Sequence, residues 1–288
     1  FFGGSADLSH SNMTFIKGDG LQDDAHRTER NIQFGVREFA MATVLNGMML
    51  HGGVRVFGGT FFVFSDCLKA ALRLSALQNL PVTYVFTHDS IAVGEDGPTH
   101  EPIEHLASLR TIPNTYVFRP ADATETQAAW YLAQNVNDKP TSIVLTRQNL
   151  PVLENSSFEK VAKGAYVVYE TSSDFDTILI ATGSEVALAV SVAQELEKEG
   201  MKVRVVSMPS IELFEEQTSE YKEALLPRSI RRRVSLEMGN TALWYKYVGL
   251  DGLAIGINKF GASAPANKVI EEYGFSVEKV VARIKNEL

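Results

Sequence analysis

The sequence predicts an α/β protein of two domains, each built on a mostly parallel sheet flanked by helices. Short runs rich in β-branched residues alternate with segments of helical periodicity along the 288 residues, as in βαβ units. Hydrophobic residues make up 45% and charged residues 22%, which is typical of a globular protein with a sizeable core. A chain of this length accommodates two domains of ordinary size.

Six short apolar runs are predicted to be buried strands. They are Val82–Thr87, Ser142–Thr146, Thr177–Ala181, Val203–Ser207, Val234–Glu237 and Leu253–Ile257. Four other segments have helical periodicity, namely 36–50, 65–78, 122–135 and 184–199. Asp122 is the expected N-cap of the third. The fourth carries one apolar face, made of Val186, Ala189, Val190, Ala193 and Leu196.

Residues 151–163 follow the first set of units and lack clear periodicity. We therefore expect a linker there, between a domain at 1–150 and a second α/β domain at 164–288. The pair Gly3-Gly4 is expected to form a turn, because glycine adopts backbone conformations that other residues avoid.

Composition narrows the classes of partner. The net charge of −8 argues against nucleic acid or an anionic membrane as the main partner. The single Cys67 cannot form an internal disulfide, which fits a cytoplasmic protein. We find no apolar run long enough to span a membrane and no signal peptide. The start at Phe1-Phe2, without Met, indicates a segment of a larger protein.

Two segments carry unusual chemistry for their surroundings. Glu38 lies in the otherwise apolar stretch 34–41, where burial of its charge is costly unless the carboxylate is paired or serves in catalysis. The segment His88–His100 contains Gly94, Gly97 and Pro98, which break regular structure. It is therefore predicted to be a loop leaving the carboxyl end of strand 82–87, where open α/β sheets bind ligands.

Together with Gly3–Asn12 and Arg147–Leu150, these two segments resemble the pyrimidine-binding half of transketolase, a thiamine-diphosphate enzyme. The resemblance continues into the C-terminal third. It implies a pyrimidine-binding domain at 1–150 and a transketolase C-terminal domain at 164–288, without the N-terminal diphosphate-binding domain. The implied reaction is transfer of a two-carbon ketol unit from a ketose phosphate to an aldose phosphate in the pentose phosphate pathway.

The resemblance also assigns residues to the cofactor. Glu38 would hydrogen-bond a ring nitrogen of the aminopyrimidine and act as its acid–base partner. Phe61 and Phe64 would surround that ring, whereas Cys67 occupies a third position where the family has Tyr. An apolar side chain at Leu8 would support the bent cofactor, with Asp7 in the polar network beside it.

The remaining assignments concern the sugar phosphates. Asp96 would bind the C2 hydroxyl of an aldose acceptor, and His100 would lie against the oxygen atoms around the reacting carbon as a catalytic residue. His88 and Arg147, helped by Ser11, would bind the phosphate. Arg suits that role because its planar guanidinium donates two hydrogen bonds to phosphate oxygens.

No metal site is expected within the sequence. His100 and His105 are five residues apart, which does not place both on one helical face, and Mg²⁺ or Ca²⁺ would bind with the diphosphate on the absent domain. Gly18-Asp19-Gly20 with Asn46 imitates a diphosphate-binding motif, but no strong strand precedes it, and we interpret it as a coincidence. Thr182-Gly183-Ser184-Glu185 is interpreted as a plain βα connection in preference to an anion site.

The family resemblance implies a homodimer whose cofactor lies between subunits, so the segment alone is expected to be inactive. Three alternatives remain open. These are a naturally split transketolase subunit, the β subunit of a 2-oxoacid dehydrogenase, and a non-catalytic dimerisation module. The second would not require Asp96, His100 and Arg147 together. No residue after about 164 is a candidate for catalysis.

Overall fold

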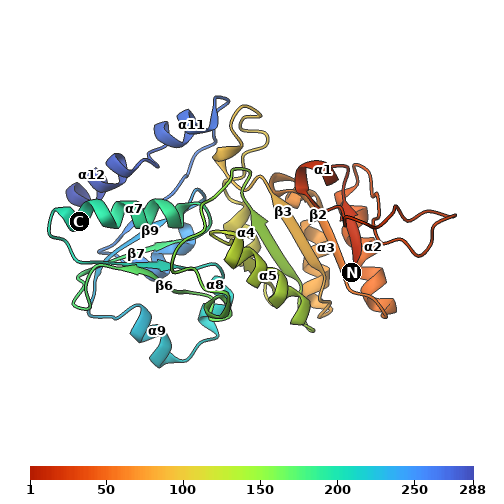
Figure 1. Ribbon diagram of the computed structural model, residues 1–288, viewed down its shortest axis with the longest axis horizontal. Helices are drawn as coiled ribbons and strands as arrows, with labels where there is room; N and C mark the ends of the chain where they lie inside the picture. Colours follow the sequence, from red (N-terminus) through yellow and green to blue (C-terminus); the bar gives the residue numbers. More distant parts are fainter.

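The computed structural model describes all 288 residues and contains two sheets, each flanked by helices (Figure 1). The first sheet has the strand order β1-β2-β3-β5-β4 and the second has the order β10-β9-β7-β8-β6. All neighbouring strands are parallel except β6 and β8, which are antiparallel. The predicted fold class, two mostly parallel α/β domains, is confirmed.

The strands of the first sheet are β1 (Phe2–Ser5), β2 (Val56–Phe61), β3 (Thr83–Thr87), β4 (Tyr116–Phe118) and β5 (Thr141–Leu145). Those of the second are β6 (Tyr166–Glu170), β7 (Thr177–Ala181), β8 (Val203–Ser207), β9 (Arg232–Leu236) and β10 (Leu253–Ile255). The predicted β7 and β8 have the observed bounds, and the other four predicted strands differ from β3, β5, β9 and β10 by one or two residues at one or both ends.

The helices of the first domain are α1 (Ser9–Asn12), α2 (Glu38–His51), α3 (Ser65–Leu77), α4 (His105–Arg110) and α5 (Ala123–Asn135). Those that follow are α6 (Phe158–Val161), α7 (Glu185–Lys198), α8 (Ile211–Glu215), α9 (Ser219–Leu225), α10 (Tyr245–Val248), α11 (Ala266–Glu272) and α12 (Val277–Glu287). Short 3₁₀ turns lie at Phe62–Phe64, Ile91–Val93 and Ala242–Trp244. The Asp122 side chain accepts a hydrogen bond from the Glu125 amide, so its predicted role as the N-cap of α5 is confirmed.

Glycine-rich strands were missed by the pattern, and the expected turn at Gly3-Gly4 is wrong. Both glycines lie within β1, between backbone segments that approach closely. A Cβ atom on Gly3 would lie 2.0 Å from the carbonyl oxygen of Phe57, and one on Gly4 would lie 2.0 Å from that of Ile32. These glycines are therefore needed for close packing rather than for a turn.

The apolar core is continuous between the two sheets. Its largest cluster joins Phe118 and Ile143 of the first domain to Leu179 and Val186 of the second. A separate cluster lies under α2 and α3, and another lies under α8 and α10. Residues 151–163, the predicted linker, run between β5 and β6 and include α6. No helix is both long enough and apolar enough to cross a bilayer.

A buried cluster of charges also joins the domains. Arg119, which follows β4 and is fully buried, donates from Nε to Asp89 Oδ2 at 2.8 Å and from Nη1 to Glu185. Arg110 of α4 makes two hydrogen bonds of 2.8 Å to the carboxylate of Glu237. Burial alone would raise the pKa of Glu237, but Arg110, together with Arg119 and Thr182, outweighs it and holds that pKa at about 2.

The fully buried Arg119 gives a stability prediction. Arg119→Met keeps much of the side-chain volume but leaves Asp89 and Glu185 without their cation, and we expect a loss of about 3–5 kcal/mol in the free energy of unfolding. Urea denaturation measures this change. The control Arg283→Ala removes an exposed pair with Glu287 on α12 and is expected to cost less than about 0.5 kcal/mol. A loss at Arg119 no larger than the control would contradict the prediction.

Candidate active site

The candidate site residues lie at the carboxyl edge of the first sheet. Parallel strands end at the same edge, so loops that follow β1, β2, β3 and β5 meet there. The residues at or after these ends are Asp7, Leu8 and Ser11 after β1, Phe61 and Phe64 at β2, His88, Asp96 and His100 after β3, and Arg147 after β5. The tenth, Glu38, begins α2 and contacts Thr60 near the end of β2.

A cavity of about 500 Å³ brings Ser11, His88 and Arg147 together. These are the three residues to which the family resemblance assigned phosphate binding. Arg147 is exposed and makes no ion pair within the chain, so its charge is available to an anion. The remaining lining residues are Asn12, Met13, Thr87, Leu145 and Thr146.

His88 is held firmly in this cavity. Its backbone is in the left-handed region with φ of 64°, and its side chain is only 7% exposed. Nδ1 lies 2.8 Å from Thr87 Oγ1, and the ring stacks on Phe61 with 3.8 Å between centroids. Burial, followed by the charge of Arg147, lowers the pKa of His88, although Asp96 and Asp89 oppose the shift. The ring is therefore favoured in its neutral form, which can still donate a hydrogen bond to an oxygen ligand.

The rings of four residues form a group beside the cavity, namely Phe61, Phe64, His88 and His100. The rings of Phe61 and Phe64 are nearly parallel, with planes 8° apart and centroids 6.3 Å apart. The ring of His100 lies edge-on to Phe64 at 5.6 Å. Phe62, which lies between the two half-buried Phe residues in sequence, points instead into the core and is fully buried. The structure thus separates two ligand-accessible aromatics from a core residue.

Glu38 is less buried than its apolar neighbourhood suggested. It is half-buried at the first turn of α2, where its Oε1 lies 3.5 Å from the hydroxyl of Thr60. The adjoining Phe39 is 50% exposed, and Val44 on the same helix is 48% exposed. The expected burial of Glu38 is therefore wrong for this chain by itself, because the apolar side chains around it face outward.

The other predicted site residues lie nearby with different exposure. Asp7, with φ of 68°, lines a second cavity of about 160 Å³, and Leu8 is half-buried before α1. Asp96 is exposed and His100 is half-buried, with Nδ1 2.9 Å from Thr99 Oγ1. Sequence reasoning did not single out Asn12, which lines the larger cavity, or Thr60, the contact of Glu38.

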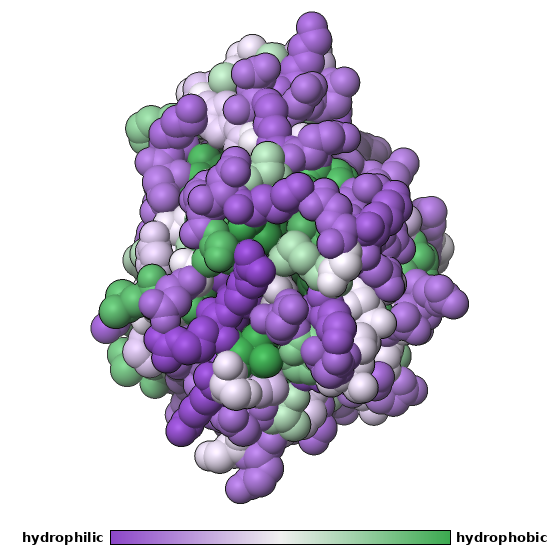
Figure 2. Space-filling model, turned by 90° about the vertical axis from the view of Figure 1, so that its left-hand side faces the viewer, coloured by the Kyte–Doolittle hydropathy of each residue, from purple (hydrophilic) through white to green (hydrophobic).

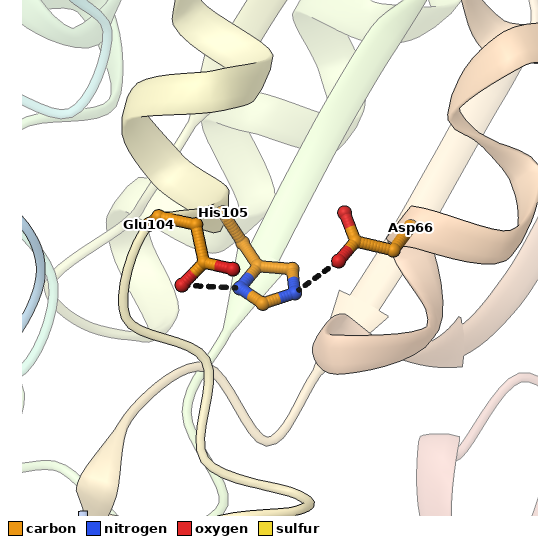
Figure 3. A group of neighbouring side chains, drawn as sticks. All are labelled: Asp66, Glu104 and His105. Carbon is orange, nitrogen blue, oxygen red and sulfur yellow. Dashed lines mark ion pairs between the residues drawn. The ribbon is translucent and has the colours of Figure 1, made fainter. Parts of the chain in front are cut away.

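One group of side chains has the composition of a metal site, although its geometry is that of an ion-paired histidine (Figure 3). Asp66 Oδ2 lies 3.2 Å from Nε2 of His105, whereas Glu104 Oε2 lies 3.9 Å from its Nδ1. The carboxylates thus approach opposite nitrogens of one ring, and Lys69 also pairs with Asp66. This arrangement does not fit the octahedral oxygen ligation that Mg²⁺ requires.

The segment Gly18-Asp19-Gly20 and Asn46, which imitate a diphosphate-binding motif, make structural contacts within the chain. Asp19 pairs with Arg30, and Asn46 donates to the carbonyl of Ala71 and accepts from Ser75 in the core between α2 and α3. The turn at 182–185 is filled by Arg119, whose guanidinium lies 2.8 Å from the Cβ position of Gly183. Neither segment is available to a phosphate.

The reactivity of the Cys67 thiol depends on the nearby charge of Glu38. Burial, followed by the charges of Glu38 and Asp66, raises the pKa of its thiol. We expect Glu38→Gln to lower that pKa and to increase alkylation by iodoacetamide at pH 8 by about two- to threefold, because the thiolate is the nucleophile. Cys67 is the only cysteine, so the rate is read from mass spectrometry of the whole chain. The control Glu104→Gln leaves the rate unchanged. An unchanged rate in Glu38→Gln would show that the two groups do not interact.

Comparison with known proteins places both domains. Residues 1–152 match the family model of the transketolase pyrimidine-binding domain, and residues 164–276 match that of the transketolase-like C-terminal domain. The chain is 71% identical over 286 residues to a probable transketolase of Streptococcus pneumoniae and 58% identical over 289 residues to a transketolase of Bacillus subtilis. It covers 44% and 43% of those proteins, which in turn cover 99% of the chain.

Solved structures agree with these matches. A transketolase from Pichia stipitis in complex with sedoheptulose 7-phosphate superposes with a TM-score of 0.95 at 43% identity, covering 99% of this chain and 42% of that one. A split-gene transketolase, an inactive β4 tetramer, superposes with a TM-score of 0.76 at 25% identity and is covered over 95% of its length. The chain therefore belongs to the transketolase family and holds its pyrimidine-binding and C-terminal domains.

Proposed function

We propose that this chain supplies the pyrimidine and sugar-phosphate half of a transketolase active site. The reaction is transfer of a two-carbon ketol unit from a ketose phosphate to an aldose phosphate. The observation that carries the proposal is the convergence of Glu38, the Phe61–Phe64 pair and the cavity of His88 and Arg147 at one sheet edge. The diphosphate and its metal would bind to a domain outside these 288 residues.

The residues present fit the pyrimidine end of thiamine diphosphate. Glu38 offers a carboxylate whose one side-chain hydrogen bond within the chain is the long one from Thr60, so it can accept from a protonated ring nitrogen. Phe61 and Phe64 offer half-buried aromatic faces for a planar ring. The bound cofactor supplies the nucleophilic carbon and electron sink that this carbon–carbon cleavage requires.

The loop after β3 and the start of the loop after β5 would bind the sugar phosphates. Arg147 and His88 would hold the phosphate, with Ser11 as a third donor, while Asp96 and His100 would bind hydroxyl groups near the reacting carbon. Support comes from the cavity that Ser11, His88 and Arg147 share and from the likeness to a transketolase solved in complex with sedoheptulose 7-phosphate. A neutral His88 would add a directed hydrogen bond without a second charge.

The partners would be a second copy of the enzyme and its diphosphate-binding domain, in the cytoplasm. The exposed apolar side chains on and just before α2 support this proposal, because a helix that is apolar all round is normally covered. They are Val36, Phe39, Val44 and Leu50. Neither nucleic acid nor a membrane is a proposed partner.

A split subunit is the second candidate. It is favoured by the superposition of both domains on a split-gene transketolase chain, with a TM-score of 0.76 at 25% identity. That protein is described as an inactive β4 tetramer, which parallels our expectation that this half has no activity alone. Both candidates place the same residues at the same half-site.

The proposal is tested by mixing the chain with the N-terminal half of a related transketolase, thiamine diphosphate, Mg²⁺, xylulose 5-phosphate and ribose 5-phosphate. We expect ketol transfer in the mixture and none from the chain alone. Glu38→Ala should abolish measurable transfer, because the aminopyrimidine loses its acid–base partner. Cofactor-bound complexes without transfer would refute the proposed reaction, and turnover by the chain alone would refute the division of the site.

Arg147 separates substrate binding from cofactor activation. Arg147→Ala should raise KM for the sugar phosphates by about 10–100-fold, because a hydrogen bond to a charged group contributes about 1.5–3 kcal/mol. Steady-state kinetics of the mixture measure this change. Arg73→Ala, on α3 away from the cavity, is the control and should leave KM unchanged. A KM unaffected by Arg147→Ala would remove Arg147 from the phosphate site.

A further inference from the structure

The loop 88–104 is held by the C-terminal domain as well as by its own. It carries His88, Asp96 and His100, three of the residues assigned to the sugar phosphates. Figure 1 shows α11 beside the loop that precedes α4, and the two also contact each other through the 3₁₀ turn at Ile91–Val93. Contacts from the C-terminal domain therefore help to position these side chains, although none of that domain's own residues is a candidate for catalysis.

The contacts along this loop are specific and tight. The hydroxyl of Ser263 donates to the carbonyl of Glu95 at 2.7 Å, and the amide of Asn240 donates to the carbonyl of Ile103 at 2.9 Å. A Cβ atom on Gly94 would lie 3.0 Å from the amide nitrogen of Ala266. The loop thus fits against the segment 261–266 with little room to shift.

Glu101, the neighbour of His100, lies at the centre of this contact. Its side chain is 2% exposed and makes no ion pair. A Cβ atom on Gly261 would lie 1.6 Å from its Oε2, so the carboxyl occupies the space that a side chain at 261 would fill. The backbone amides of Ala262 and Gly94 face its carboxyl. Burial, followed by the charge of Glu101, raises the pKa of Tyr273, the titratable group of the C-terminal domain that interacts with it.

Such a carboxyl is more stable without its charge. Burial raises the pKa of Glu101 to about 7, and the backbone amides of Ala262 and Gly94 oppose the shift only in part. This shift makes the stability of the contact depend on pH. Because the folded pKa lies above the ordinary glutamate value of 4.5, the contact is fully favourable below pH 4.5 and weakens as pH rises through 7.

We propose that Glu101, seated against residues 261–263, is a positioning residue through which the C-terminal domain fixes the loop that presents Asp96 and His100 to the sugar. The proposal rests on the proposed function for its catalytic consequence. The contact of Glu101 with residues 261–263, the Glu101 latch, is a property of this chain by itself. It assigns to the C-terminal domain a role in catalysis without contact to substrate.

The latch is tested on the chain alone by hydrogen exchange of the peptide covering 88–104. After correction for intrinsic exchange, the wild-type loop should exchange about tenfold faster at pH 8 than at pH 6, because ionised Glu101 leaves its buried seat. Glu101→Gln, neutral and of the same shape, should be protected equally at both pH values. Glu95→Gln, an exposed control on the same loop, should behave as wild type.

A second variant keeps the test independent of the charge. Ser263→Ala, an exposed position, removes the hydrogen bond to Glu95 and should increase exchange of the loop at both pH values. Protection of the wild-type loop that does not change with pH, or that Ser263→Ala leaves intact, would overturn the latch.

The catalytic consequence is measured in the assembled enzyme. Glu101→Ala should raise KM for the sugar phosphates about tenfold at pH 7 with kcat changed less than about twofold, and Glu101→Gln should restore the wild-type KM. If hydrogen exchange shows the latch but no variant transfers ketol units, the proposed function fails and the latch stands. If transfer occurs and Glu101→Ala leaves KM unchanged, the positioning role fails.

Discussion

The fully buried guanidinium of Arg119 is the constraint on which the arrangement of the two domains depends. It pairs with Asp89 in the first domain and with Glu185 in the second, at positions where neither carboxylate is reached by water. Separating the domains would leave these charges unpaired in a low-dielectric surrounding, which costs far more than the loss of an exposed pair. Since Asp89 adjoins His88, the same contact fixes the start of the loop 88–104.

This junction also explains why only one of two similar sheets has an open ligand edge. The carboxyl ends of β7 and β9 lead to Thr182 and Glu237, where an open α/β sheet would ordinarily bind a ligand. Here Arg119 donates to Thr182 and Arg110 donates to Glu237, so side chains of the first domain occupy that edge. The second sheet thereby serves as a support, while the edge of the first remains open to solutes.

The sequence predicted those parts of the fold and site that depend on local pattern. Apolar runs such as β7 and β8 have the predicted bounds, whereas β1 and β2 were missed because their glycines resemble turns until the facing backbone is known. Site residues within one segment, such as His88 and His100, could be grouped from their spacing and the family resemblance. The domain junction could not be predicted, because Arg110 and Glu237 are 127 residues apart and nothing local relates them.

The exposure of Glu38 has a similar origin and leads to a mechanistic point. The Glu38 carboxylate is half-buried at the start of α2, and apolar side chains beside it face outward. Covering two of these side chains, Val36 and Phe39, would remove water from around the carboxylate and strengthen a hydrogen bond that it makes to a ligand. The surface that completes the site would therefore do more than hold the remainder of the cofactor. It would also exclude water from around Glu38.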